Sequence, residues 1–227
     1  MPLLSFFPVG IYKQKITLDN EYKQQLIYSI LDQEKKNPNK YKNKAWLGDE
    51  HGDEFLHNNK LFYNLYSIIS AEIKSYLNSM SYNEKLLNVY FQRSWATISR
   101  NTENISMHTH MQSHVSFAYY LSLPEGSGKL EFSNERSYNE IISGTNIKAK
   151  LLETITNKLS HHNSPNVVCT VEEDEIYIFP SKLKHGTHPG TNMAPRISLS
   201  SDVILSLNEN IHHTEMGTPD ISYWKKF

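Results

Sequence analysis

Short runs rich in β-branched and aromatic residues dominate the chain after residue 88, and they limit the fold more than any other feature. Six such runs fall between residues 89 and 205, most of them separated by turn-forming residues. They cover 89–98, 114–123, 129–132, 167–172, 175–179 and 196–205. Such residues fit a half-buried pleated surface, and many short strands divided by turns are typical of a barrel or sandwich. The sequence therefore predicts a β-barrel core.

Two helices are expected before this region. Asp19 is a candidate N-cap for a helix that runs to about Lys35. A second helix is expected over 61–80, where apolar residues recur at steps of three and four. A strand is expected over 6–12, and residues 36–60 are expected to be irregular. Helices followed by many short strands indicate an α+β fold, in which the helices support the barrel.

The domain organisation follows from length and pattern. No internal repeat or linker divides the 227 residues, and this length suits one domain. We predict a single domain over 1–227, with a helical support region over 1–88, a barrel core over 89–205 and a C-terminal tail over 206–227. Residues 133–166 are polar and poorly patterned, so they form an insert in the barrel that is a candidate lid.

Composition and charge argue against several classes of protein. The formal net charge is -1 at pH 7, so no strong basic field is present and a nucleic-acid partner is disfavoured. No run of 18 apolar residues occurs, so no transmembrane helix is expected. The apolar start lacks a basic leader and a cleavage site, which indicates part of the fold and not a signal peptide. Cys169 is the only cysteine, which excludes an intramolecular disulfide and favours a cytoplasmic setting.

Three histidines form a candidate metal site. His108 and His110 lie just before the strand at 114–123, and residues i and i+2 of an extended segment point to the same face. His185 lies 75 residues beyond His110, at the end of another predicted strand, with His188 as a rival. Two ligands from one strand end and a third from a distant strand suit a barrel metal site with open positions. The pair alone is weak evidence, because surface histidines explain most such pairs.

An arginine on the last predicted strand makes the pattern more specific. Arg196, Ser198 and Ser200 share one face of this strand, while the other face is apolar, which favours a buried role over a surface salt bridge. An arginine with hydroxyls in phase forms a bidentate clamp for a carboxylate. The strand at 114–123 has a face of small residues followed by a phenol, which leaves room for a small ligand. That face carries Ser116, Ala118 and Tyr120.

Together, these motifs resemble the 2-oxoglutarate and iron(II)-dependent oxygenase superfamily. The resemblance rests, in chain order, on His108-Thr109-His110, Ser116-Phe117-Ala118-Tyr119-Tyr120-Leu121, Gly126-Ser127-Gly128-Lys129-Leu130-Glu131-Phe132, Phe179-Pro180-Ser181, His185 and Arg196-Ile197-Ser198. It is strong over 90–132 and 172–203, weak over 1–89 and absent over 133–166, and it is greatest to a group of uncharacterised oxygenases of about this length. It implies a double-stranded β-helix, a jelly-roll or cupin-like barrel, with N-terminal supporting helices.

The resemblance also implies a function and a set of roles. The chain is expected to be a non-haem dioxygenase with Fe(II) and 2-oxoglutarate as cofactors. The resemblance implies His108 and His185 as metal ligands, and we predict His110 as the third; these three are also the expected catalytic residues. A second group of residues is expected to bind the distal carboxylate of 2-oxoglutarate. That second group is Tyr120, Arg196 and Ser198. The implied reaction is hydroxylation of an unactivated C–H bond of a small molecule or peptide side chain by dioxygen, with succinate and CO2 formed.

His110 departs from the family pattern, because most of the superfamily has an aspartate at this place. Either His110 is a ligand, which the i, i+2 geometry favours, or His114 or Glu131 supplies the contact instead. Two other functions stay open. A cupin-like metalloprotein that does not use 2-oxoglutarate would leave Arg196 and Tyr120 without a purpose. A non-catalytic β-barrel binding module would explain the missing aspartate but not the arginine.

Overall fold

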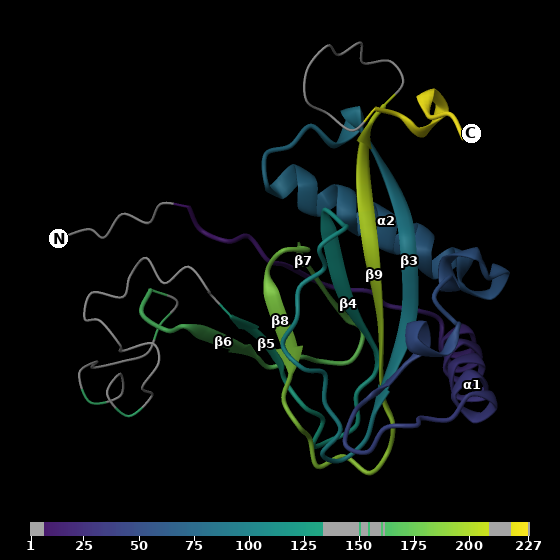
Figure 1. Ribbon diagram of the computed structural model, residues 1–227, viewed down its shortest axis with the longest axis vertical. Helices are drawn as coiled ribbons and strands as arrows, with labels where there is room; N and C mark the ends of the chain where they lie inside the picture. Colours follow the sequence, from purple (N-terminus) through teal and green to yellow (C-terminus); the bar gives the residue numbers. More distant parts are fainter. Residues whose placement is uncertain are drawn as a thin grey trace.

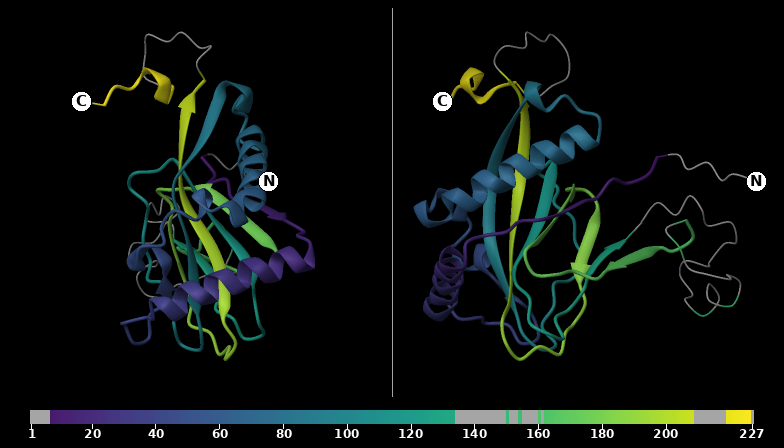
Figure 2. Two further views of the ribbon diagram at one scale, coloured as in Figure 1. Left: turned by 90° about the vertical axis from the view of Figure 1, so that its right-hand side faces the viewer. Right: turned by 180° about the vertical axis from the view of Figure 1, so that it is seen from behind.

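The computed structural model describes residues 7–133, 150, 154, 160, 162–208 and 219–226. Within them, two antiparallel sheets face each other, and the two helices lie on the outer side of the larger sheet (Figure 1 and Figure 2). The larger sheet contains β1 (Tyr12–Lys15), β2 (Trp46–Leu47), β3 (Leu87–Ser99), β4 (Val115–Ser122), β7 (Glu175–Pro180) and β9 (Arg196–Leu207). The smaller sheet contains β5 (Leu130–Ser133), β6 (Asn166–Cys169) and β8 (Lys184–Thr187). The strand orders are β1-β7-β4-β9-β3-β2 and β6-β5-β8.

Both predicted helices are confirmed, at α1 (Asn20–Lys36) and α2 (Tyr63–Ser79). The Asp19 carboxylate caps α1 by accepting hydrogen bonds from the backbone N–H groups of Glu21 and Tyr22, at 2.9 and 3.1 Å. These bonds satisfy donors that a helix start leaves without partners. Within the described part of the chain, no helix combines the length and the apolar character needed to cross a membrane.

The helices bury their apolar faces against the outer face of the larger sheet. The side chains that α2 buries are Leu65, Tyr66, Ile69, Ile73, Tyr76 and Leu77. From the sheet they meet the alternate residues Phe117, Tyr119 and Leu121 of β4, and Ile197, Leu199 and Val203 of β9. Because each fully buried apolar side chain stabilises the fold by about 1.5–3 kcal/mol, this layer is the main source of folding free energy.

The opposite face of the larger sheet looks into the barrel. Tyr120 and Phe179 from this sheet pack against Leu130 and Phe132 from the smaller sheet, and this second apolar cluster joins the two layers. The face predicted from strand alternation is confirmed, because Ala118 and Tyr120 lie on the inner side of β4 while their neighbours in sequence join the helical core.

Two predictions about the first 60 residues are wrong. Of the described part of 6–12, only Tyr12 lies in a strand; β1 begins there, after Pro8 and Gly10, since proline has no N–H to donate to a sheet ladder. The region 36–60 is not wholly irregular, because it contains β2, which pairs with β3 and buries Trp46.

The structure also adds a strand that the sequence did not predict. β8 has the sequence Lys-His-Gly-Thr, with only one β-branched residue, and it forms because it pairs with β5. β9 ends at Leu207, two residues beyond the predicted barrel boundary at 205. The candidate lid at 133–166, including a short helix expected at 147–159, lies mostly outside the described residues.

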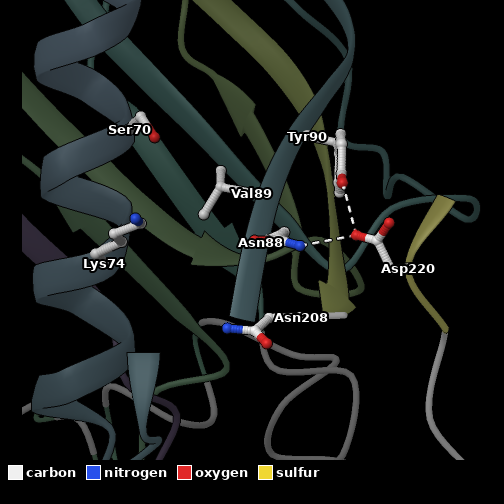
Figure 3. A pocket seen from close by; sticks show the side chains of 7 residues that line it. All are labelled: Ser70, Lys74, Asn88, Val89, Tyr90, Asn208 and Asp220. Atoms are coloured by element: carbon white, nitrogen blue, oxygen red, sulfur yellow. Dashed lines mark hydrogen bonds between the residues drawn. The ribbon is translucent and has the colours of Figure 1, made fainter. Parts of the chain in front are cut away.

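The C-terminal segment 219–226 is attached to β3 through one carboxylate. Asp220 accepts hydrogen bonds from Asn88 Nδ2 at 2.8 Å and from Tyr90 Oη at 3.0 Å (Figure 3). A polar cavity of about 500 Å³ lies beside this contact. It is lined by Ser70, Lys74, Asn88, Val89, Tyr90, Asn208 and Asp220. No histidine lines it, so it is separate from the predicted metal site.

The layer between α2 and the sheet gives a stability prediction. Ile69→Ala, which removes a fully buried side chain of α2, is expected to lower the free energy of unfolding by about 2–5 kcal/mol. The matched change Ile221→Ala removes the same atoms from a side chain that is 54% exposed, and is expected to cost within about 0.5 kcal/mol. Chemical denaturation of both variants measures the difference; equal losses would contradict this description of the core.

Candidate active site

A cavity of about 390 Å³ opens into the barrel and takes residues from both sheets. β3, β4 and β9 contribute side chains from the larger sheet, and β5 and β8 contribute from the smaller one. All six residues singled out by the sequence line this cavity: His108, His110, Tyr120, His185, Arg196 and Ser198. The barrel therefore brings together positions that lie up to 90 residues apart in the chain.

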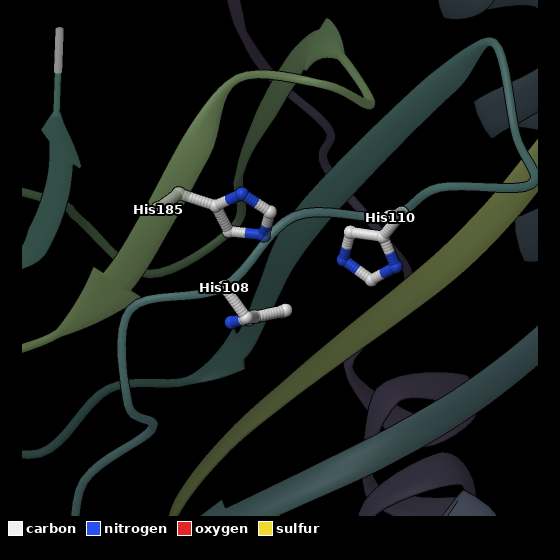
Figure 4. A group of neighbouring side chains, drawn as sticks. All are labelled: His108, His110 and His185. Atoms are coloured by element: carbon white, nitrogen blue, oxygen red, sulfur yellow. The ribbon is translucent and has the colours of Figure 1, made fainter. Parts of the chain in front are cut away.

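The three histidines form one cluster, which Figure 4 shows. His108 and His110 come from the extended segment before β4, and His185 comes from β8. One nitrogen from each ring lies within 4.8 Å of the other two, a span that one metal ion can bridge after small side-chain adjustments. The ring centroids are 4.4 to 5.2 Å apart.

Backbone pairing explains how the cluster forms. The N–H of His108 donates to the carbonyl of His185, and the N–H of His185 donates to the carbonyl of His108, both at 2.9 Å. The N–H of His110 donates to the carbonyl of Ser181, also at 2.9 Å. The histidine segment therefore lies antiparallel to β8 at this point, joined to it by an isolated bridge between His108 and His185. Its extended form places His108 and His110 on the same side, as the i, i+2 spacing predicts.

Hydrogen bonds to the backbone set the state of two imidazoles. His108 Nδ1 lies 2.9 Å from the carbonyl oxygen of Ser106, and His185 Nδ1 lies 2.8 Å from that of Leu183. A carbonyl oxygen only accepts, so each Nδ1 carries the proton and each Nε2 keeps a lone pair. Burial lowers the pKa of His185 to about 3 and also lowers the pKa of His108. Both rings are thus neutral near pH 7, as metal ligation requires.

A buried carboxylate holds the third imidazole. His110 Nδ1 lies 2.7 Å from Asp202 Oδ1, so it donates to that oxygen. Ser113 Oγ donates to the same oxygen at 3.3 Å, and the Arg93 guanidinium lies 3.6 Å from the other carboxylate oxygen. Burial acts to raise the pKa of Asp202, but the hydrogen bond from His110 and these neighbours hold it below its usual value.

The alternative ligands are engaged elsewhere. His114 Nδ1 accepts a hydrogen bond from the backbone N–H of Leu205 at 3.0 Å. The Glu131 carboxylate pairs with His188 Nε2 at 2.8 Å, which also occupies the rival third histidine. Among the described residues, the three-histidine group is the one set close enough to share an ion. The geometry favours His110 over His114 or Glu131.

The inner end of the cavity carries buried donors without partners. Arg196 is 1% exposed, and its Nε and Nη1 have no hydrogen-bond partner among the described residues. The same holds for the hydroxyl of Tyr120, whose ring lies 5.0 Å from the Arg196 guanidinium carbon. Burial lowers the pKa of Arg196 and raises that of Tyr120. A buried unpaired guanidinium is costly, so these groups fit a carboxylate ligand such as the distal end of 2-oxoglutarate.

Two residues of this site were not predicted from the sequence. Thr97 lies opposite Ser198 in the β3–β9 ladder and lines the cavity, and its buried hydroxyl has no hydrogen-bond partner in the described part of the chain. A threonine in a strand is ordinary, so the sequence gives no signal for it. Asp202 could have been found, because it continues the alternation of Arg196, Ser198 and Ser200 along β9.

Sequence comparison identifies a family over the barrel. Residues 93–202 match the family described as "Putative 2OG-Fe(II) oxygenase". This range runs from β3 to β9 and contains all three histidines, Arg196 and Asp202. Among curated proteins, no sequence match was found.

Solved structures share the fold at low sequence identity. The non-haem alpha-ketoglutarate-dependent carbocyclase SnoK from nogalamycin biosynthesis has a TM-score of 0.56 and 10% identity, covering 93% of this chain and 88% of that one. A Pseudomonas putida prolyl-4-hydroxylase has a TM-score of 0.52 and 11% identity, covering 86% and 92%. The collagen prolyl hydroxylase of Paramecium Bursaria Chlorella virus-1, solved with 2-oxoglutarate, has a TM-score of 0.51 and 12% identity. That match covers 85% of this chain and 94% of the viral one. The predicted double-stranded β-helix is confirmed.

The histidine cluster gives a metal-binding prediction. Loss of a residue that hydrogen-bonds to a metal ligand typically weakens metal binding about 10–100-fold. His185→Ala removes a ligand itself, so it is expected to weaken the binding of Ni²⁺ by more than that. The matched change His188→Ala is expected to leave the affinity within about threefold, since His188 pairs with Glu131. Titration calorimetry on metal-free protein measures both, and equal affinities in the two variants would contradict the proposed cluster.

Proposed function

We propose that this chain is an iron(II)- and 2-oxoglutarate-dependent oxygenase that hydroxylates an unactivated C–H bond, a proposal that the family match over residues 93–202 supports. One observation carries the proposal. A single cavity has three convergent imidazoles at one place and unpartnered buried donors at another. The first group suits a divalent metal ion and the second suits a carboxylate, and 2-oxoglutarate bound to iron(II) needs both.

The residues divide into two binding roles. His108, His110 and His185 would hold the iron through Nε2. Arg196 and Tyr120 would bind the distal carboxylate of 2-oxoglutarate, and Ser198 and Thr97 would add hydroxyl donors. When bound, the pair would supply activation of dioxygen: 2-oxoglutarate would lose CO2 and take up one oxygen atom to become succinate, and the other oxygen atom would enter the substrate.

The protein would hold the binding groups in fixed orientations and shield them from water. The Arg196 side chain is enclosed, so its attraction to a carboxylate is screened little by water. Rings of neighbouring residues keep the imidazoles in place: Trp95 lies 5.9 Å from His110, and Phe179 lies 4.6 Å from His185, between centroids. A fixed arrangement of this kind lowers the entropy lost when the reacting groups meet.

The outer part of the cavity is the proposed substrate entrance. Asp49, Arg93 and Trp95 line it, and the Arg93 side chain is 42% exposed, so this side meets solvent. Arg93 pairs with Asp49 at 2.5 Å and lies over the Trp95 ring at 5.2 Å. The charges at the entrance are mixed and partly neutralised, which suits a small molecule or a peptide side chain better than a polyanion.

The alternative functions account for fewer observations. A cupin-like metalloprotein that does not use 2-oxoglutarate leaves Arg196 and Tyr120 buried and unpaired for no reason. A non-catalytic binding module gives no reason for three convergent imidazoles in one cavity. We also propose one domain over 1–227, which the packing of both helices on the larger sheet supports.

The cofactor pair gives a spectroscopic prediction. Iron(II) and then 2-oxoglutarate, added without oxygen, are expected to give a visible metal-to-ligand charge-transfer band that Arg196→Ala and His185→Ala both lose. Thr97→Val keeps the shape of the side chain but removes a donor to a charged group, and is expected to weaken 2-oxoglutarate binding about tenfold. Titration of the band with 2-oxoglutarate measures this change.

Thr170→Val serves as the matched control, because the exposed Thr170 side chain does not line the cavity. It is expected to bind 2-oxoglutarate like the unaltered protein. Bound iron without any band would favour the cupin-like alternative, and no iron binding at all would favour the non-catalytic module.

A further inference from the structure

Asp202 is the one buried carboxylate in contact with a histidine of the cluster, among the described residues. Its side chain is 9% exposed and that of His110 is 13% exposed, so their 2.7 Å contact is shielded from water. Asp202 lies in the middle of β9, opposite Arg93 of β3 and Ser116 of β4. It is therefore fixed by two neighbouring strands and cannot move far from the imidazole.

The neighbours of Asp202 leave His110 as its main partner. The Arg93 guanidinium is nearer to Asp49, at 2.5 Å, than to Asp202, at 3.6 Å, and the longer distance is outside the range of a hydrogen bond. Ser113 adds a weaker contact at 3.3 Å, and it also donates to Ser181 at 2.7 Å. The shortest and most enclosed contact of the carboxylate is the one with His110 Nδ1.

The contact has a clear chemical consequence for the ring. An ionised carboxylate only accepts hydrogen bonds, so it keeps the proton of His110 on Nδ1 and the lone pair on Nε2. Of the three histidines, His108 and His185 reach the same state through backbone carbonyls, and only His110 relies on a charged side chain. A carboxylate behind a histidine ligand also makes that ligand more basic.

We propose that Asp202 is a positioning residue that supplies, from behind His110, the negative charge that a ligand set made of imidazoles alone lacks. In this arrangement His110 would bind the metal ion directly. The Asp202 carboxylate would lie behind the His110 ring, farther from the ion, and β9 would hold it in place. The inference rests on the proposed function, because it assumes that His108, His110 and His185 bind one metal ion.

The first experiment compares Ni²⁺ affinity by calorimetry in the full chain and in Asp202→Asn. The amide has the size of the carboxylate but no charge, and it can donate to His110 as well as accept, so the affinity is expected to fall 10–100-fold. Glu175→Gln is the matched control: Glu175 is another buried carboxylate of the same sheet, paired with Lys13 at 2.7 Å, and its change is expected to leave the affinity within about threefold.

The second experiment reads the ring directly and needs no variant. Nitrogen-15 NMR of the metal-free protein is expected to show His110 with its proton on Nδ1, and Asp202→Asn is expected to show a mixture of both forms. A merely structural carboxylate would change stability without changing this signal. The wild-type spectrum alone decides the inference if Asp202→Asn does not fold.

Two results would overturn the inference while leaving the metal site intact. One is an Asp202→Asn protein that binds Ni²⁺ within about threefold of the unaltered chain. The other is a wild-type His110 that carries its proton on Nε2. If the unaltered chain binds no Ni²⁺, the proposed function fails first, and the inference is overturned with it.

Discussion

β9 pairs with β3 along its whole length and with β4 along much of it, and the site depends on this double pairing. Because side chains alternate along a strand, one face of β9 joins the helical core and the other faces the barrel. The apolar face fixes the register, since a shift of one residue would expose Ile197 and Leu199 and bury their polar neighbours under the helices. The stability of the core thus determines where Arg196, Ser198 and Asp202 lie.

The polar face of β9 gathers groups whose burial costs free energy. Among the residues that the structure describes, Nε and Nη1 of the enclosed Arg196 and the hydroxyls of Tyr120 and Thr97 have no hydrogen-bond partner. In a protein interior such groups are tolerated when a ligand completes their hydrogen bonds. The fold offsets this cost elsewhere, through the packing of α1 and α2 on the sheet. Ligand binding is therefore expected to stabilise the folded chain, because it pairs what folding alone leaves unpaired.

The two ends of the cavity are formed by different kinds of segment. At the inner end, Arg196, Tyr120 and Thr97 come from three adjacent strands, and the regular ladder places them. At the end that carries the proposed metal ligands, two of the three histidines come from a segment outside the named strands, held by hydrogen bonds to β8 and to Ser181. Asp202 connects the ends, since it shares the inward face of β9 with Arg196 and contacts His110.

The sequence by itself determined both helices, most strands, the inward face of β4 and β9, and the pattern of histidines and arginine. These features depend on local spacing, capping and alternation, which neighbouring residues set. Only the tertiary structure decided β8, whose four residues have little strand preference and pair with β5. Likewise, the preference for His110 over His114 as a proposed ligand and the proposed roles of Thr97 and Asp202 depend on contacts across strands. The physical reason is that a contact between residues far apart in sequence depends on sheet register, which no local pattern specifies.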